Sequence, residues 1–204
     1  MVNKKGLLIV VSGPAGSGKG TVNGKLLESD EFRFSVSATT RAPRPGEVDG
    51  VNYYYISREE FQRRLENGEM LEYTEYCGNF YGTPLREAEQ VLASGKHLIL
   101  EIEVEGAMNV KAKYPDAVLI MLLPPNHTTQ EARLRGRGTE TEEKIRERLA
   151  RTREEANFFP QYDYIVYNYD NMSDRAVEDV LSIVRAEQLR TLRNPTASAD
   201  YFAN

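Results

Sequence analysis

Cysteine is nearly absent from this chain of 204 residues, which contains only Cys77. One cysteine cannot form an intrachain disulfide, and no second thiol is present to share a metal ion with it. This composition is typical of a protein from a reducing compartment, where the simplest role for Cys77 is that of a small, semi-buried side chain.

Long apolar runs and an excess of positive charge are also missing. No stretch approaches the roughly 20 apolar residues that cross a bilayer, and residues 1–5 lead directly into an expected strand instead of a signal peptide. The formal net charge of -5 argues against a general affinity for nucleic acid or anionic membranes. We therefore expect one compact cytoplasmic domain with no nucleic-acid or membrane partner.

Glycine is concentrated directly after the apolar run at residues 7–11. The pattern G-x-x-x-x-G-K stands there between an expected strand and an expected helix, the context in which such a loop binds a polyphosphate. Inward-facing N–H groups, the positive end of the helix and the Lys19 ammonium group would all meet the anion. The alternative is a glycine-rich turn that contains a lysine by chance. This phosphate loop comprises Gly13, Pro14, Ala15, Gly16, Ser17, Gly18, Lys19, Gly20 and Thr21.

The loop departs from the usual motif at Gly20, where a serine or threonine hydroxyl would bind Mg²⁺, and Thr21 follows one position later. We therefore expect Mg²⁺ to be held mainly by phosphate oxygens and water, and we assign no protein ligand to it.

Strand and helix patterns alternate along the chain. In the final helix, Val177, Leu181 and Val184 are expected to face the sheet, and the segment after Pro195 is expected to be disordered. Capping boxes at 57–60, 128–131 and 139–142 begin helices, and Thr83 with Pro84 is expected to cap another. Extended segments are expected at 32–37, 51–56, 70–76, 97–103, 118–123 and 163–168, and helices after the phosphate loop and at 57–68, 83–95, 106–114, 128–136, from 139 and at 173–194.

This alternation predicts an α/β fold, with a parallel β-sheet covered by helices on both faces and ligands at the carboxyl ends of its strands. Residues 38–83 interrupt the pattern. They combine a proline-rich loop, a run of tyrosines and a hairpin, and are expected to form a small, mostly β insertion.

Two arginines in the proline-rich loop, Arg41 and Arg44, can converge on one anion, because guanidinium groups match the geometry of phosphate. Tyr53 and Tyr81 could add hydroxyl groups to the same site. The alternatives are solvated surface arginines and tyrosines that only pack within the insertion.

Arg137 stands between Gly136 and Gly138, a poor place for a structural arginine but a suitable one for a side chain that must move. Arg148 follows on the next expected helix. Mobile arginines beside a phosphate loop suit a migrating phosphoryl group, whose charge spreads over its oxygens. A charged, solvent-facing helix explains the acidic residues of this segment but not Arg137.

Five segments together resemble the guanylate kinase family of nucleoside monophosphate kinases, over residues 6 to about 193. They are 13–21, 35–44, 78–83, 100–106 and 136–140. The resemblance implies transfer of a phosphoryl group from ATP, with Mg²⁺, to GMP and also dGMP, by a monomer or a homodimer. It also implies a P-loop kinase core at 1–37, 84–125 and 149–194, a GMP-binding subdomain at 38–83, a helical lid at 126–148 and a tail at 195–204.

The same resemblance implies residue roles. ATP would contact the phosphate loop, Arg133, Arg137 and Asn168, and catalysis would depend on Lys19, Arg41, Arg137 and Arg148. GMP would contact Ser37, Arg41, Arg44, Tyr53, Glu72, Tyr81, Thr83 and Glu103.

Glu72 also suits guanine on chemical grounds, because a carboxylate only accepts hydrogen bonds and guanine offers donors at N1 and N2. Two departures from the family pattern are Glu103, where many members have aspartate, and Glu105, where they have glutamine. A sugar-phosphate kinase would have no use for the guanine-reading residues, a guanylate-kinase-like scaffold module would lack the phosphate loop, and a GTPase would carry an N-K-x-D motif.

Overall fold

The computed structural model describes residues 5–76, 78–138 and 140–203. Cys77 lies outside the described residues, and so does Thr139, the first residue of one expected capping box. Most of the N-terminal segment at 1–5, which was expected to lead into a strand instead of a signal peptide, also lies outside them. Among the described residues, no helix combines the length and apolar character needed to cross a membrane.

A five-stranded sheet forms the core, and all of its paired strands are parallel, in the order β2-β7-β1-β8-β9. The α/β fold expected from the alternating pattern is therefore confirmed. β1 lies between β7 and β8, so the loop after β1 opens at the point where the strand order reverses. The strands are β1 (Leu8–Ser12), β2 (Phe32–Phe34), β7 (His97–Leu100), β8 (Val118–Leu123) and β9 (Tyr164–Tyr167).

Helices cover both faces of this sheet because its strands carry apolar residues on both sides. Along β1, Ile9 and Val11 belong to one core cluster, which is closed by α1 and α7. Leu8 and Val10 belong to the other, which is closed by α3 and α4. The helices are α1 (Lys19–Leu26), α3 (Leu85–Ala93), α4 (Val104–Lys113) and α7 (Ser173–Leu189).

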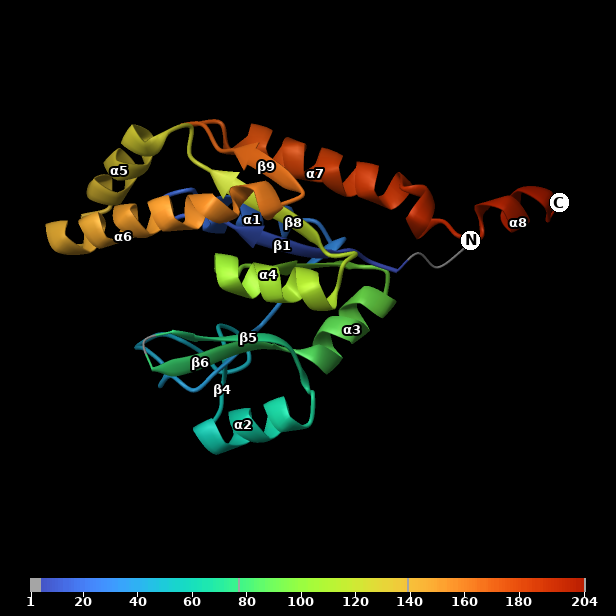
Figure 1. Ribbon diagram of the computed structural model, residues 1–204, viewed down its shortest axis with the longest axis horizontal. Helices are drawn as coiled ribbons and strands as arrows, with labels where there is room; N and C mark the ends of the chain where they lie inside the picture. The colour runs from blue at the N-terminus through green and yellow to red at the C-terminus, as the bar shows by residue number, and fades with distance from the viewer. Residues whose placement is uncertain (1–4, 77, 139, 204) are drawn as a thin grey trace.

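Residues 38–84 build the second sheet, in the order β4-β3-β6-β5, with α2 packed against it. Figure 1 shows this insertion beside α4, while α5 and α6 lie across the other side of the core. The expected boundary of the lid at residue 148 falls within the continuous helix α6. These elements are β3 (Ala38–Thr39), β4 (Tyr54–Tyr55), α2 (Arg58–Glu66), β5 (Met70–Tyr76), β6 (Asn79–Pro84), α5 (His127–Gly136), α6 (Glu142–Glu155) and the 3₁₀ turns η1 (Ala156–Gln161) and η2 (Thr191–Arg193).

Several of the expected helix starts are wrong. Thr83 does not cap α3: it lies in β6, and Pro84 occupies the cap position without a side-chain hydrogen bond. The helix expected from 128 begins one residue earlier, because Asn126 Oδ1 accepts the hydrogen bond from Thr129 N at 2.8 Å. Ser57 caps α2, as expected. The cap of α6 is Thr141, two positions after the start of the expected capping box.

Two expectations near the C-terminus are also wrong. Leu181 is 40 % exposed, because the positions that face the sheet from α7 are Ala176, Val180 and Val184. The segment after Pro195 is not disordered but contains a short helix, α8 (Ala197–Phe202).

His97 is a buried residue that connects β7 to the start of β1, since its Nδ1 accepts a hydrogen bond from Leu7 N at 3.0 Å. Burial lowers the pKa of His97 below its ordinary value of 6.5. The unfolded chain therefore takes up a proton near that pH while the folded chain does not, so stability is complete above about pH 6.5 and falls as the pH drops towards the folded pKa.

We expect His97→Asn to flatten this pH dependence, because the asparagine Oδ1 can still accept from Leu7 N but does not titrate. The measurement is the free energy of unfolding by urea at about pH 7.5 and about pH 5.5. His127→Asn, at an exposed position at the start of α5, is the control. If His97→Asn and the unchanged protein lost the same free energy of unfolding on acidification, His97 would not be the source of this pH dependence.

Candidate active site

The phosphate loop connects β1 to α1 in a conformation that only glycine adopts easily. Gly18 has φ +91°, and a Cβ atom there would lie 2.2 Å from Asn168 Nδ2. The loop is closed by a hydrogen bond from Ser17 N to Pro14 O at 3.1 Å. Lys19 Nζ donates to Gly13 O at 2.5 Å, which holds the ammonium group over the loop. An anion cradle therefore exists where the glycine spacing predicted it.

Asn168 supports this loop from the end of β9. It is 5 % exposed, and its Nδ2 donates to Ser17 O at 2.9 Å. Its Oδ1 and the hydroxyl of Ser17 are buried without a hydrogen-bond partner among the described residues. Two unsatisfied polar atoms beside an anion cradle are typical of a site that is completed by a ligand.

Arg133 connects α5 to the same loop. Its guanidinium group donates to Gly16 O at 3.2 Å and to Asn168 O at 2.8 Å. It also forms an ion pair with Asp170 at 2.7 Å. Arg133 and Asn168, two of the three residues outside the loop that were expected beside ATP, thus lie directly against the phosphate loop.

A cavity of about 330 Å³ extends from the phosphate loop to the insertion, and we call it the nucleotide cavity. It brings together five of the eight residues expected to bind GMP and the lysine of the loop. Its walls are Gly13, Lys19, Ser37, Tyr53, Glu72, Thr74, Tyr81, Gly82, Glu101, Ile102 and Glu103.

Glu72, in the wall of this cavity, forms a buried pair with Thr83 on the neighbouring strand. Glu72 is 3 % exposed, and its Oε1 accepts a hydrogen bond from Thr83 Oγ1 at 2.8 Å. Burial raises the pKa of the Glu72 carboxyl, and the hydrogen bonds from Thr83 and the charge of Lys113 only partly offset this effect. A buried carboxylate with one oxygen oriented by a hydroxyl is well placed to accept further hydrogen bonds from a ligand.

Arg41 is bound to a carboxylate that the sequence-based interpretation did not single out. Its guanidinium group donates to both oxygens of Glu47 at 2.9 Å. The same carboxylate accepts from the backbone N–H of Arg44 at 2.7 Å and from the hydroxyl of Tyr55 at 2.8 Å. These contacts lower the pKa of Glu47 to about 2, and the hydrogen bond from the Arg44 backbone has the largest effect.

The guanidinium groups of Arg41 and Arg44 have different surroundings: the Arg41 group donates to Glu47, whereas Arg44 contributes only its backbone N–H to that carboxylate and its side chain is exposed. Tyr53 and Tyr81 do lie together, with ring centroids 5.9 Å apart, and the Arg41 guanidinium lies 5.5 Å from the Tyr53 ring. The phosphate-binding role expected for these four residues stays a prediction.

A smaller cavity of about 120 Å³ separates the phosphate loop from α6, and it contains Arg148 and Lys19 in its walls. Arg148 forms an ion pair with Glu140 at 2.7 Å. Arg137, by contrast, is exposed at the end of α5 and lines neither cavity. Of the two lid arginines expected in catalysis, the structure places only Arg148 beside the loop.

Glu103 lines both cavities and reaches α6, where it accepts from Arg151 at 3.1 Å. Arg151 also pairs with Glu155 at 3.0 Å. Helical spacing could have found Arg151, because it stands three positions after Arg148 on α6. Glu47 had a weaker signal, as a lone carboxylate three positions after Arg44.

Metal-binding side chains are sparse. Within the described ranges, no group of three or more acidic, histidine or cysteine side chains could hold a metal ion. Glu101, at the carboxyl end of β7, accepts from Asn23 Nδ2 at 2.8 Å, and its carboxylate shares the nucleotide cavity with Lys19. Carboxylates placed in this way can bind the water shell of a Mg²⁺ ion that arrives with a polyphosphate.

Comparison with known proteins agrees with this geometry. Residues 5–187 match the family model described as guanylate kinase. The chain is 50 % identical to a guanylate kinase of Halalkalibacterium halodurans over 194 residues, which cover 95 % of this chain and 94 % of the relative. It is also 50 % identical to a guanylate kinase of Lactococcus lactis over 193 residues, which cover 94 % and 93 %.

A solved structure shows the same similarity in three dimensions. The crystal structure of guanylate kinase from Anaplasma phagocytophilum superposes with a TM-score of 0.73 at 35 % identity, over 93 % of this chain and 90 % of that one. Since the family model covers most of the sequence and the relatives match it nearly end to end, this chain belongs to the guanylate kinase family.

Proposed function

We propose that this protein transfers the γ-phosphoryl group of ATP, bound with Mg²⁺, to GMP and to dGMP, forming ADP and the nucleoside diphosphate. The observation that carries this proposal is the nucleotide cavity, because one continuous space joins the phosphate loop to the buried Glu72–Thr83 pair. The low cysteine content fits a role in the reducing cytoplasm.

At the acceptor end, the Glu72 carboxylate accepts the N1–H and N2–H donors of guanine, while Thr83 and Ser37 complete the base site. Adenine has a lone pair at N1 instead of a hydrogen, so it would leave the buried carboxylate unpaired, a loss of several kcal/mol. Glu103, at the wall of the same cavity, adds a second carboxylate near the base and the metal-bound water.

The GMP phosphate is bound by Arg41, Arg44, Tyr53 and Tyr81. In the structure Arg41 donates to Glu47. The GMP phosphate must therefore either displace Glu47 from Arg41 or share the Arg41 guanidinium group with it. The four residues belong to the insertion, and we therefore propose residues 38–83 as the GMP-binding subdomain.

At the donor end, the phosphate loop and Lys19 bind the ATP phosphates, and Mg²⁺ bound with ATP would supply further positive charge for these groups. Arg133 and Asn168 border the ATP side of the loop. We propose residues 126–148 as the lid, whose Arg137 and Arg148 neutralise the migrating phosphoryl group when the lid closes. No general base is required, because the GMP phosphate is already an oxyanion near neutral pH.

An assay of ADP release with GMP, AMP, CMP and UMP as acceptors tests this proposal. We expect GMP to be preferred over AMP by at least about 10²-fold in kcat/KM, since a site built around hydrogen-bonded polar groups rejects the wrong base strongly. Equal rates with all four acceptors, or no transfer to GMP, would refute the proposed function.

In the same assay, Glu72→Gln should weaken GMP binding by roughly 10- to 100-fold, the value of a hydrogen bond to a charged group. ATP binding should change little, because Glu72 lies on the insertion. Glu75→Gln is the matched control, since Glu75 is on the same strand with its side chain about half exposed and paired with Arg58. Titration calorimetry with each nucleotide measures both affinities, and equal losses for GMP and ATP would show that Glu72 reads no base.

A further inference from the structure

Gly106 is the third residue of α4, at a position where the backbone alone does not require glycine. Its conformation is that of the surrounding right-handed helix, which residues other than proline adopt without strain. Glycine within a helix is less favourable than alanine, because it loses more conformational freedom on folding. A glycine here therefore indicates that the missing side chain leaves space for another group.

Two side chains of the nucleotide cavity occupy the space beside Gly106. A Cβ atom there would lie 3.3 Å from Glu72 Oε2 and 3.3 Å from Ile102 Cδ1. Carbon atoms in ordinary contact are about 3.5–4.0 Å apart, so both contacts would be tight. Glu72 and Ile102 both line the nucleotide cavity, and Gly106 itself is buried. An added methyl group would therefore press on the carboxylate that is proposed to read guanine.

The two oxygens of the Glu72 carboxylate have different surroundings. Oε1 accepts a hydrogen bond from Thr83 Oγ1 at 2.8 Å, whereas Oε2 lies towards Gly106 on α4. A carboxylate that accepts from both N1–H and N2–H of guanine presents both of its oxygens to the base. Displacing Oε2 would lengthen or bend one of these hydrogen bonds, and hydrogen bonds weaken steeply as their geometry departs from the ideal. The space at Gly106 therefore bears on the position of Oε2.

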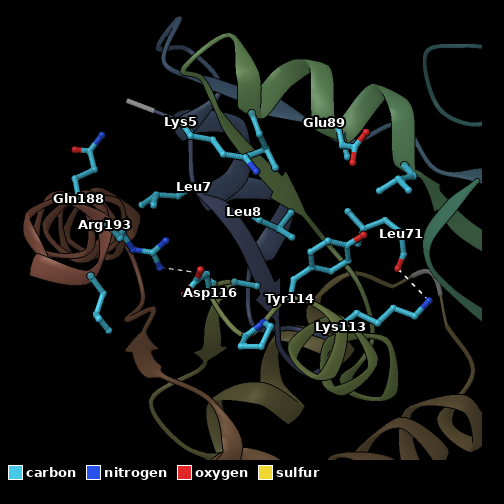
Figure 2. Close-up of a pocket in the computed structure, with 17 residues that line it drawn as sticks. Lys5, Leu7, Leu8, Leu71, Glu89, Lys113, Tyr114, Asp116, Gln188 and Arg193 are labelled. Atoms are coloured by element: carbon cyan, nitrogen blue, oxygen red, sulfur yellow. Dashed lines mark hydrogen bonds between the residues drawn. The ribbon is translucent and has the colours of Figure 1, made fainter. Parts of the chain in front are cut away.

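Glu72 cannot easily retreat from α4, because β5 is held against this helix. Leu71, the preceding residue of β5, is 1 % exposed and belongs to the same core cluster as Ala107 of α4. Lys113, at the end of α4, donates from Nζ to Leu71 O at 3.4 Å. Figure 2 shows this hydrogen bond in the wall of a cavity of about 400 Å³ that both residues line. Figure 1 shows the insertion that contains β5 beside α4, so these contacts hold Glu72 close to Gly106.

We propose that Gly106 is a specificity-determining position that acts through Glu72: the absence of a side chain at 106 leaves Oε2 free to accept a hydrogen bond from guanine. This role rests on the proposed reading of guanine by Glu72. It makes discrimination of the base depend on a contact between the core and the insertion, because Gly106 lies on α4 and Glu72 lies on β5.

Gly106→Ala tests the proposal by titration calorimetry with each nucleotide. We expect the Kd of GMP to rise by about 10-fold, the effect of weakening one hydrogen bond to a charged group. The Kd of ATP should stay within about twofold, and the Tm should not fall, because alanine is the better helix former.

Gly24→Ala is the matched control. Gly24 is an exposed glycine inside α1, where an added Cβ atom would meet no other part of the described chain within 4 Å. Both affinities should therefore stay unchanged in this variant. If Gly106→Ala left the Kd of GMP within about twofold of the parent value, or weakened GMP and ATP equally, the proposal would be overturned.

A double-mutant cycle with Glu72→Gln shows whether Gly106 acts through Glu72. If it does, adding Gly106→Ala to Glu72→Gln should raise the Kd of GMP by less than about twofold, whereas independent effects would multiply. A multiplicative loss would overturn the proposal. If Glu72→Gln weakened GMP binding and Gly106→Ala did not, only the role of Gly106 would fail. If Glu72→Gln itself left GMP binding unchanged, the proposed reading of guanine by Glu72 would fail as well.

The contact with Ile102 is separated from the contact with Glu72 by Ile102→Val, which removes the Cδ1 atom. With this change Glu72 Oε2 is the remaining atom within 3.3 Å of the alanine Cβ, so any loss of stability in Gly106→Ala that is caused by Ile102 is relieved. Relative to Ile102→Val alone, the double variant should still bind GMP about 10-fold more weakly. Recovery of GMP affinity in the double variant would show that displacement of Ile102 weakens binding, and it would overturn the proposal.

Discussion

Replacing Lys19 by methionine is expected to lower the rate of phosphoryl transfer by about 10²- to 10³-fold or more, the usual effect of removing one charged group that stabilises a transition state. Methionine keeps the length of the side chain but removes the only ammonium group that donates to the phosphate loop among the described residues, through Gly13 O. Folding should be almost unaffected, because the change removes one hydrogen bond worth about 1 kcal/mol. The measurements are kcat and KM for ATP and GMP, together with the Tm.

Lys25→Met is the matched control for this prediction. Lys25 lies on the same helix, six positions further on, and pairs with Asp174 at 2.6 Å on the surface. Its loss removes the same charge from α1 without touching the loop, so kcat should stay within about twofold, as expected for a surface pair of small energetic value. A Lys19→Met enzyme that kept more than a few per cent of the original turnover with an unchanged Tm would remove Lys19 from the catalytic role.

The second large effect is expected from Arg137. Arg137 is exposed in the structure, and its position between Gly136 and Gly138 would let it turn towards the phosphate loop on the proposed closure of residues 126–148. An interaction that forms only in the transition state changes kcat and leaves ground-state binding nearly constant. Arg137→Ala should therefore lower kcat by on the order of 10³-fold, while the Kd values of ATP and GMP change little.

Single-turnover kinetics and calorimetry of Arg137→Ala separate these quantities. Arg153→Ala, an exposed arginine on α6 that lines neither active-site cavity, is the control. If Arg137→Ala instead weakened both nucleotides and left kcat within about threefold, Arg137 would be a uniform binding residue. The charge-neutralising role would then pass to Arg148, which lines the same cavity of about 120 Å³ as Lys19, between the phosphate loop and α6.

The features that could be predicted from the sequence are those determined by local chemistry. The phosphate loop follows from glycine spacing, because the left-handed backbone at Gly18 excludes other residues whatever the rest of the fold does. The cap at Ser57 involves residues three positions apart. The burial of the parallel strands on both faces also follows from the sequence, because their apolar runs are continuous instead of alternating with polar residues.

Local patterns failed where two rules competed for the same residue. Thr83 and Pro84 match the start of a helix, but Thr83 is paired in β6 opposite Glu72, and this long-range contact decides its conformation. Leu181 fits a helical stripe with Val177, yet the stripe that faces the sheet runs through Val180, because the packing of α7 against α1 and β9 sets the rotation of the helix. Intrinsic preferences of a fraction of a kcal/mol are easily overridden by burial of whole side chains.

Within the site, the sequence by itself determined which chemical groups are available: a loop that binds phosphate, arginines for charge and a carboxylate suited to guanine. Only the tertiary structure decided their partners. Arg41 donates to Glu47, and Arg151 on α6 donates to Glu103. Asn168 supports the phosphate loop through Ser17, which is 151 positions away in the sequence. Such contacts depend on how distant elements pack, and the energy of an ion pair or a hydrogen bond depends on distance and burial that no spacing along the chain encodes.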